Sequence, residues 1–155
     1  MITIRNSIKA IIIEDNAMLF MEGQDQDTGE IYYILPGGGQ NGGETFVETA
    51  KRECLEELGA EVHVGELRLI REYIAKNHKE PGHRWYHIHQ IEYMFFCTLK
   101  TPVDMSKAEG DEEQTGYKWI SFADFESANI YPRILRSVFD DKGEITSPVY
   151  LGDVN

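Results

Sequence analysis

The stretch that most constrains the fold is residues 36–59, where a glycine-rich segment runs directly into an amphipathic helix. Residues 36–43 read PGGGQNGG, and five glycines in eight positions predict a loop whose backbone turns tightly or approaches another group closely. Residues 44–58 lack Pro and Gly and predict a helix that ends at Gly59. Its apolar positions share one stripe and comprise Phe46, Val47, Ala50, Cys54 and Leu58. We therefore expect a helix that packs one face on a sheet.

Three acidic side chains occupy the wrong end of this helix for stability alone. The helix dipole favours acids in the first turn and bases in the last, by roughly 0.3–1 kcal/mol each. Glu53, Glu56 and Glu57 nevertheless lie near the C-terminus, and at about 100° per residue they project from one narrow arc. Oxygen ligands of this kind suit Mg²⁺ or Mn²⁺ better than Zn²⁺ or copper. The pattern indicates a divalent-cation site, with an acidic face exposed to water as the alternative.

Composition limits the partners of such a site. The 155 residues are enough for one domain, and we expect a single domain over residues 1–155. A formal net charge of −12 disfavours binding to nucleic acid polymers or membrane surfaces, because both depend on Lys and Arg, but it allows a small phosphorylated ligand held through a metal. No apolar run spans a bilayer, and no signal peptide is expected. Cys54 and Cys97 are expected to be reduced core thiols of a cytoplasmic protein, with a buried disulfide as the alternative.

The rest of the chain alternates β-rich runs with polar loops. We expect strands at residues 7–13, 17–21, 31–35, 62–75, 85–99 and 117–120, and a strand or ordered tail near 149–151. A bulge is expected near Arg68, and residues 91–99 are expected in a central strand because both faces are largely apolar. Short helices are expected at 121–126 and 132–140. Strands before and after a central helix predict an α+β fold, a mixed α/β sandwich.

The glycine and charge spacing around the helix is similar to a known motif. The pattern Gly38-x5-Glu44-x7-Arg52-Glu53-Cys54-x-Glu56-Glu57-x-Gly59-Ala60 resembles the Nudix box of hydrolases that act on nucleoside diphosphates linked to another moiety. Every polar and glycine position is filled, whereas Cys54 and Ala60 fill the two aliphatic positions loosely. The GYKWISFADF stretch at residues 116–125 also looks like the family. The resemblance implies the Nudix fold, a mixed central sheet with the box helix on one side and a C-terminal helix on the other.

The resemblance also implies a metal site. In the family the helix glutamates hold Mg²⁺, for which Mn²⁺ can substitute, so the implied ligands are Glu53, Glu56 and Glu57. A main-chain carbonyl of the glycine loop often joins them, which points to Gly37. Glu53 would be either a ligand or the base that deprotonates water. The chemistry would be metal-assisted attack of water on phosphorus, with bound metal rather than basic side chains making the pocket attractive to phosphate.

Further residues receive implied roles. Arg52 and Glu44 would pair with box carboxylates, fixing the loop on the helix. Family members often add a carboxylate from a distal loop as ligand or general base. We expect Glu113 in that catalytic role, with Glu112 as the alternative, although the segment AEGDEEQTG also reads as an ordinary acidic surface loop.

Substrate contacts are expected in two places. Gly38 and Gly39 would approach the substrate from the glycine loop. Arg84 and Trp85 could stack on a base or bind a phosphate, or could simply end a strand. Three nearby histidines could belong to a substrate pocket, a strand surface, the packing of a core or interface, or a zinc site, and these are His83, His87 and His89.

We therefore expect a Mg²⁺-dependent hydrolase of the diphosphate linkage in a nucleoside diphosphate derivative. ADP-ribose, an NDP-sugar, a dinucleoside polyphosphate and a (d)NTP all fit, because no short downstream motif names the substrate. Two alternatives keep the same fold: an isopentenyl-diphosphate isomerase type and a non-catalytic nucleotide-sensing module. The number of metal ions, the general base and the oligomeric state, including a homodimer, stay open.

Overall fold

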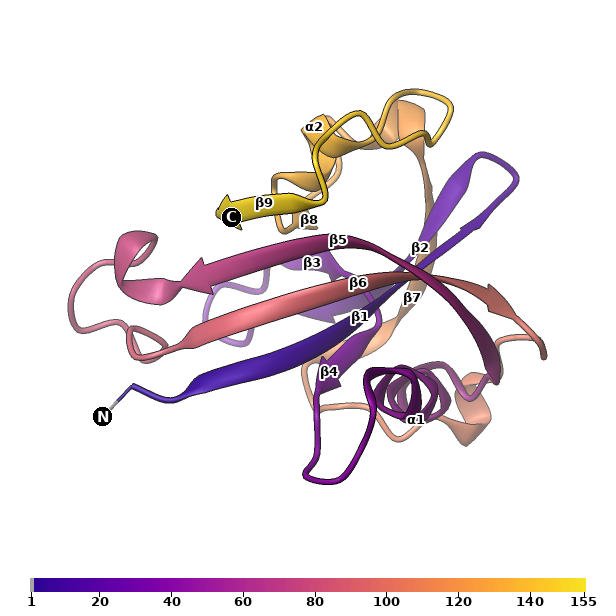
Figure 1. Ribbon diagram of the computed structural model, residues 1–155, viewed down its shortest axis with the longest axis horizontal. Helices are drawn as coiled ribbons and strands as arrows, with labels where there is room; N and C mark the ends of the chain where they lie inside the picture. Colours follow the sequence, from indigo (N-terminus) through magenta and orange to yellow (C-terminus); the bar gives the residue numbers. More distant parts are fainter. Residues whose placement is uncertain (1) are drawn as a thin grey trace.

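The computed structural model describes residues 2–155 as a long, curved sheet with few helices (Figure 1). The strands are β1 (Ile4–Glu14), β2 (Ala17–Gln24), β3 (Ile31–Ile34), β4 (Gly37–Gly39), β5 (Val62–Ile74), β6 (His89–Leu99), β7 (Gln114–Ser121), β8 (Ile130–Tyr131) and β9 (Tyr150–Asp153). The α-helices are α1 (Phe46–Leu58) and α2 (Leu135–Val138), and the 3-10 turns are η1 (Ala75–Asn77), η2 (Met105–Lys107) and η3 (Phe122–Asp124). No helix among these residues is long and apolar enough to cross a bilayer.

The strands form a mixed sheet in the order β8-β3-β2-β1-β6-β5-β9, beside which β4 pairs with β1 and β7 pairs with β2. The pairs β1–β6, β3–β8 and β5–β9 are parallel, and the remaining pairs are antiparallel. Figure 1 shows α1 below the long strands and α2 above them. The expected α+β fold, with a mixed sheet between the box helix and a C-terminal helix, is confirmed.

The sheet carries two apolar cores. In one, Ala50, Cys54 and Leu58 of α1 pack with residues of β1 and β6 such as Ile8 and Phe95. The other core includes the two buried residues of α2 together with Phe20, Leu69 and Met94. Both cysteines of the chain are buried and free, as expected. The helix is therefore held to the sheet by its apolar stripe, which leaves its acidic arc beside the glycine segment.

Two strand predictions are confirmed by the pairing pattern. β6 lies between β1 and β5, which makes it an interior strand. The β5–β6 register shifts between Val64 and Leu67 and again between Leu67 and Leu69, next to the expected bulge at Arg68. A shifted register bends the long strand, and Figure 1 shows β5 curving down toward α1.

The glycine segment is not wholly a loop. Gly37–Gly39 forms β4 and pairs antiparallel with Ser7–Lys9 of β1, so the loop prediction is wrong for these three residues. The expected close approach is present, however. A Cβ on Gly37 would lie 2.0 Å from the carbonyl oxygen of Ile8, and the φ angle of Gly37 is +138°. Only glycine fits there, and the sequence alone does not reveal that the neighbouring group is a strand backbone.

Three other elements are shorter than expected. The strand predicted over residues 85–99 begins at His89, because residues 80–88 form successive turns with hydrogen bonds such as Tyr86 N to His83 O and Ile88 N to Trp85 O. The helix predicted over 132–140 is reduced to α2, and Phe139 already pairs in a β-bridge with Ile145. In place of the helix predicted over 121–126, Ser121 ends β7 and Phe122–Asp124 form the 3-10 turn η3. In each case local turns or pairing take over the backbone hydrogen bonds that a longer element needs.

Candidate active site

The two ends of α1 fix which residues face the glycine segment. Thr45 caps the N-terminus: its Oγ1 accepts a hydrogen bond from Glu48 N at 3.2 Å, while Glu48 Oε2 accepts one from Thr45 N at 2.8 Å. Gly59 ends the helix with φ +59°, where a Cβ would meet the carbonyl oxygen of Asp104. The last turn contains no basic residue. The caps therefore set the register of the helix, and the acidic arc is left without a compensating charge in its own last turn.

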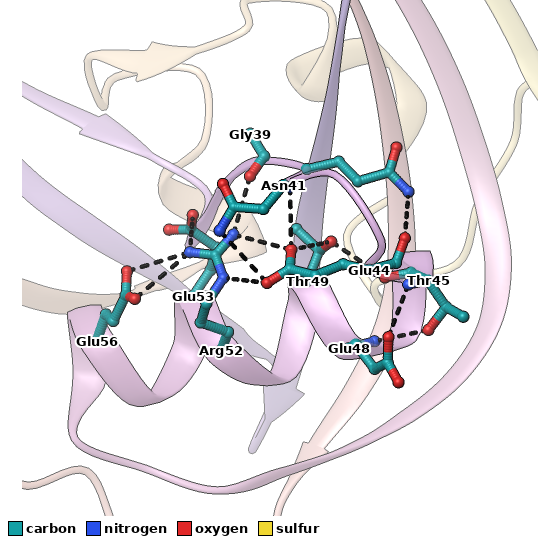
Figure 2. A network of polar contacts seen from close by, with 10 residues as sticks. Gly39, Asn41, Glu44, Thr45, Glu48, Thr49, Arg52, Glu53 and Glu56 are labelled. Atoms are coloured by element: carbon teal, nitrogen blue, oxygen red, sulfur yellow. Dashed lines mark hydrogen bonds and ion pairs between the residues drawn. The ribbon is translucent and has the colours of Figure 1, made fainter.

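Arg52 joins the helix to the glycine segment (Figure 2). Its Nε donates to Glu44 Oε1 at 2.6 Å, and its Nη2 donates to the Gly39 carbonyl oxygen at 2.9 Å. Its Nη1 donates to Glu53 Oε1 at 2.8 Å and lies 3.3 Å from Glu56 Oε2. Arg52 therefore pairs with carboxylates of the box, as expected, and these include Glu44.

This arrangement shifts the protonation equilibria of the paired groups. The hydrogen bonds from Arg52 and from the Asn41 main chain lower the pKa of Glu44 to about 2. The carboxylates of Glu44 and Glu53 raise the pKa of Arg52 above its ordinary value. Both groups therefore stay charged at neutral pH, so the link between loop and helix does not depend on pH in that range.

Glu57 has a different environment from its neighbours on the arc. Its side chain is buried, and its carboxylate accepts hydrogen bonds from Gly37 N at 3.1 Å and from Gln114 Nε2 at 3.2 Å. Burial raises the pKa of Glu57 to about 7, although Lys9 and these two donors act in the opposite direction. A cation bound near Glu57 would therefore favour the ionised form of its carboxylate and lower its pKa.

The three glutamates open onto one cavity of about 340 Å³ between α1, β1, β4 and the loop before β7. Its charged and polar side chains belong to Arg5, Ser7, Lys9, Glu53, Glu56, Glu57, Gln90, Glu109, Asp111 and Gln114, and its floor includes Gly37, Gly38 and Gly39. We call it the acidic cavity. The structure thus brings together the three helix glutamates and the three glycines that the sequence singled out.

The lining of the acidic cavity suits a hard divalent cation by the chemistry of its donors, which are carboxylate, amide and main-chain oxygens. Gln114 Oε1 is buried there without a hydrogen-bond partner among residues 2–155. A Cβ on Gly38 would lie 2.6 Å from the Glu53 carboxylate, so the carboxylate sits directly over glycine backbone. Within the same residues, however, no three His, Cys, Asp or Glu side chains converge as a ready ligand set. The chemistry of the donors therefore fits a divalent metal. The donors line one cavity, but their side chains do not point at one common position.

Gly37, the other implied metal ligand, lines the acidic cavity, whereas Glu113, the expected distal base, does not. The Gly37 carbonyl oxygen accepts a hydrogen bond from Lys9 Nζ at 3.3 Å. Glu113 faces away from the acidic cavity: its Oε2 accepts from Tyr32 Oη at 3.1 Å, and its Oε1 lies 3.6 Å from Arg84 Nη2. Glu112 likewise lines neighbouring cavities and not the acidic cavity.

Sequence reasoning missed several residues of the acidic cavity. Glu109 and Asp111 line it from the distal loop, although Glu112 and Glu113 were the expected candidates. Arg5 and Lys9 line it from β1, so basic side chains are present where metal alone was expected to attract phosphate. An even number of positions separates Arg5 and Lys9 on one strand, so both side chains lie on the same face of it. This spacing is a signal from which the sequence could have predicted that they act together.

Arg84 and Trp85 lie outside the acidic cavity but next to it. The Arg84 guanidinium carbon is 4.9 Å from the centre of a Trp85 ring, and Trp85 is 49% exposed. Both residues line two adjoining cavities that share residues with the acidic one. His87 and His89 line one of these with them. The pair is therefore placed where a bound molecule could reach it, on a turn rather than on the expected strand.

Comparison with known proteins identifies one matching family model and several solved structures of similar fold. The family model described as NUDIX domain matches residues 3–140. A NUDIX hydrolase structure from Nitrosomonas europaea has a TM-score of 0.71 at 18% identity, over 86% of this chain and 85% of that one. A MutT protein from Methanosarcina mazei Go1 has a TM-score of 0.64 at 20% identity, over 86% and 88%. An ADP-ribose pyrophosphatase from Streptococcus suis 89-1591 has a TM-score of 0.54 at 20% identity, over 79% and 77%.

At these identities the solved structures support a shared fold, and the family model carries the assignment. It spans the box, the strands around it and the residues that line the acidic cavity. The resemblance expected from the box, to a family of hydrolases, is therefore confirmed: the chain belongs to the NUDIX domain family.

Proposed function

We propose that this protein is a Mg²⁺-dependent hydrolase of the diphosphate linkage in a nucleoside diphosphate derivative, such as ADP-ribose, an NDP-sugar, a dinucleoside polyphosphate or a (d)NTP. The observation that carries the proposal is the acidic cavity, in which the carboxylates of Glu53, Glu56 and Glu57 share a lining with the cations of Arg5 and Lys9. Carboxylates suit a divalent metal, and the two cations suit phosphate oxygens. A diphosphate with its metal satisfies both sets of charges at once.

Glu53, Glu56 and Glu57, together with the Gly37 carbonyl oxygen, would hold Mg²⁺ or Mn²⁺. When bound, the metal lowers the pKa of coordinated water and offsets charge on the diphosphate. Arg52 acts as a positioning residue, because its bonds to Glu53 and Glu56 set where those carboxylates lie relative to the glycine backbone.

The remaining residues of the cavity divide between binding and proton transfer. Arg5 and Lys9 would bind phosphate oxygens from β1, while the main-chain groups of Gly38 and Gly39 approach from below. For the base that accepts a proton from water, Asp111 is the first distal candidate, because it lines the acidic cavity and Glu113 does not. Glu53 stays the alternative base on the helix itself.

Wider features of the chain support a small-molecule role. The net charge of −12 disfavours nucleic acid polymers and anionic membranes as partners. The two buried free thiols suit a reducing compartment, and we propose that the protein works in the cytoplasm as one domain over residues 1–155. A homodimer is compatible with this proposal.

The test is phosphate release from about 20 nucleotides, with and without Mg²⁺, comparing wild type with Glu57→Gln and with the control Glu66→Gln. Glu66 is exposed on β5 and lines none of the cavities described. The panel contains ADP-ribose, NDP-sugars, dinucleoside polyphosphates, dinucleotide cofactors and canonical or oxidised NTPs, with a phosphatase added to reveal monoester products.

Metal-dependent turnover of one class, lost in Glu57→Gln and kept in Glu66→Gln, is the expected result. The amide that replaces the Glu57 carboxylate would retain an oxygen for the Gly37 N–H, so the fold should survive the substitution. Equal activity in the two variants would remove Glu57 from the site. Nucleotide binding without any metal-dependent turnover would favour the non-catalytic sensing module instead.

A further inference from the structure

A second cavity, of about 670 Å³, adjoins the acidic cavity along β1. Arg5 lines both, so the two are continuous at this side chain. The other walls of the second cavity include Ile4, Gln40, Arg84, Trp85 and Ile88. We call it the tryptophan cavity. Its volume lies in the range of roughly 300–1,000 Å³ that is usual for small-molecule sites.

The chemistry of this lining differs from that of the acidic cavity. Trp85 and Ile4 are 49% and 57% exposed, so the tryptophan cavity presents apolar surface to water. The acidic cavity is lined by charged side chains and glycine backbone and contains no aromatic residue. A flat aromatic ring at one end of a ligand could stack on the indole of Trp85. The Arg84 guanidinium already lies over the same indole. Arg5, at the boundary of the two cavities, could then contact a phosphate attached to that ring.

A third cavity adjoins both the acidic cavity and Trp85. It measures about 440 Å³ and shares Ile34, Asp111 and Gln114 with the acidic cavity. Arg84 and Trp85 line it as well. The acidic cavity is thus flanked by two spaces of nucleoside size, both bordered by Trp85, and a folded ligand could place one ring in each.

Resting on the proposed hydrolase function, we propose that the substrate is a diphosphate that joins two groups, each bearing an aromatic heterocycle, and that Trp85 sets this preference by stacking on the ring in the tryptophan cavity. The diphosphate lies in the acidic cavity, and Arg5 contacts it at the boundary. Substrates with one heterocycle, such as a nucleoside triphosphate or an NDP-sugar, fill only one of these two cavities. The preference is therefore a property of the second ring and not of the scissile bond.

Diadenosine diphosphate and ADP-ribose form a matched pair for the test, because they contain the same diphosphate linkage and differ in the second adenine. The measurement is kcat and KM for both, in wild type, in Trp85→Ala and in Ile4→Ala, with Tyr117→Ala as a control. Tyr117 is an exposed aromatic residue of β7 that lines none of these cavities. Trp85 lies on a turn and Ile4 at the start of β1, both largely exposed, so folding should be kept and is checked by thermal unfolding.

We expect KM for diadenosine diphosphate to rise about tenfold in Trp85→Ala, within the range found when an aromatic residue that stacks on one base is removed. KM for ADP-ribose should rise by less than about threefold, because its one adenine can lie in the third cavity, whose lining also includes Tyr32. Ile4→Ala should separate the two substrates in the same direction, and Tyr117→Ala should not. An unchanged ratio of the two KM values in both cavity variants would overturn the proposal.

A binding measurement keeps this inference separate from the proposed function. The chain contains two tryptophans, so Trp119→Phe leaves Trp85 as the only indole emitter. Quenching of Trp85 fluorescence at lower concentrations of diadenosine diphosphate than of ADP-ribose would support the ring site, even if neither compound were hydrolysed. Equal quenching curves would overturn the ring site while leaving any measured hydrolysis in place.

Discussion

Substituting Gly38 with Ala tests whether the position of the Glu53 carboxylate, rather than its presence, sets the rate. The new Cβ would lie 2.6 Å from that carboxylate, whereas ordinary contact begins at 3.4 Å, so the carboxylate must retreat by about 0.8 Å. It is the flexible end of a side chain and can move, but moving it strains the 2.8 Å bond from Arg52 Nη1. A misplacement of about 1 Å can cost about 100-fold in rate.

We therefore expect Gly38→Ala to lower kcat by about 10- to 100-fold, or about 1.4–2.7 kcal/mol of activation free energy, with little change in Tm. Gly42→Ala is the matched control, because a Cβ there would have nothing within 4 Å. Gly37→Ala is the contrasting case: its Cβ would strike the Ile8 carbonyl oxygen, so it should lower Tm.

The assay combines initial rates on the diphosphate identified by the panel with thermal unfolding of each variant. Two results would refute the reasoning. One is a folded Gly38→Ala enzyme with the kcat of wild type. The other is an equal loss of activity in Gly42→Ala, which would attribute the effect to general stiffening of the loop.

Four further outcomes are expected. Asp111→Asn should lower kcat by about tenfold or more and Glu113→Gln by less than about threefold, since only the first lines the acidic cavity; the reverse order in initial rates would return the distal role to Glu113. Arg71→Leu should cost about 3–5 kcal/mol of unfolding free energy in urea, because it leaves Glu92 buried without the partner now 2.7 Å away; a loss below about 1 kcal/mol would contradict this. Burial acts to raise the pKa of Glu92, but Arg71, with Lys9 and Gln90, outweighs it and holds the pKa below its ordinary value. The stability that this carboxylate contributes is therefore present above the ordinary pKa of a glutamate and is lost as the pH falls through its lower folded pKa, so acid unfolding should be steeper in wild type than in the double variant Arg71→Leu, Glu92→Leu. Thr45→Ala should cost about 1 kcal/mol, measured by the same urea titration, because it removes the cap from α1.

The sequence determined the helix and its arc of acids because their signals are local. Helical period, the absence of Pro and Gly, and a glycine at the end fix residues 44–58 within two residues of the observed helix. The pairing of Arg52 with box carboxylates followed from the box resemblance and is also contained in this segment. The buried free thiols followed from apolar neighbours along the chain.

Element ends and loops were less predictable. A glycine-rich run reads as loop, and only its pairing with β1, about thirty residues earlier, makes Gly37–Gly39 a strand. Residues 85–88 have the composition of a strand, but hydrogen bonds within successive turns hold them off the sheet. In both cases the backbone partner is decided by tertiary contacts that composition does not encode.

By itself, then, the sequence determined the family, the α+β fold and the carboxylates of the box, because these depend on side-chain identity at fixed spacing within one helix and its loop. Only the tertiary structure decided which distal residues reach them. The chain path before β7 turns Asp111 into the acidic cavity and Glu113 toward Tyr32, although the two are separated by one residue. The pairing of β1 with β4 and β6 brings Arg5 between two cavities. Such placement depends on contacts between residues far apart in the chain, and no local period records it.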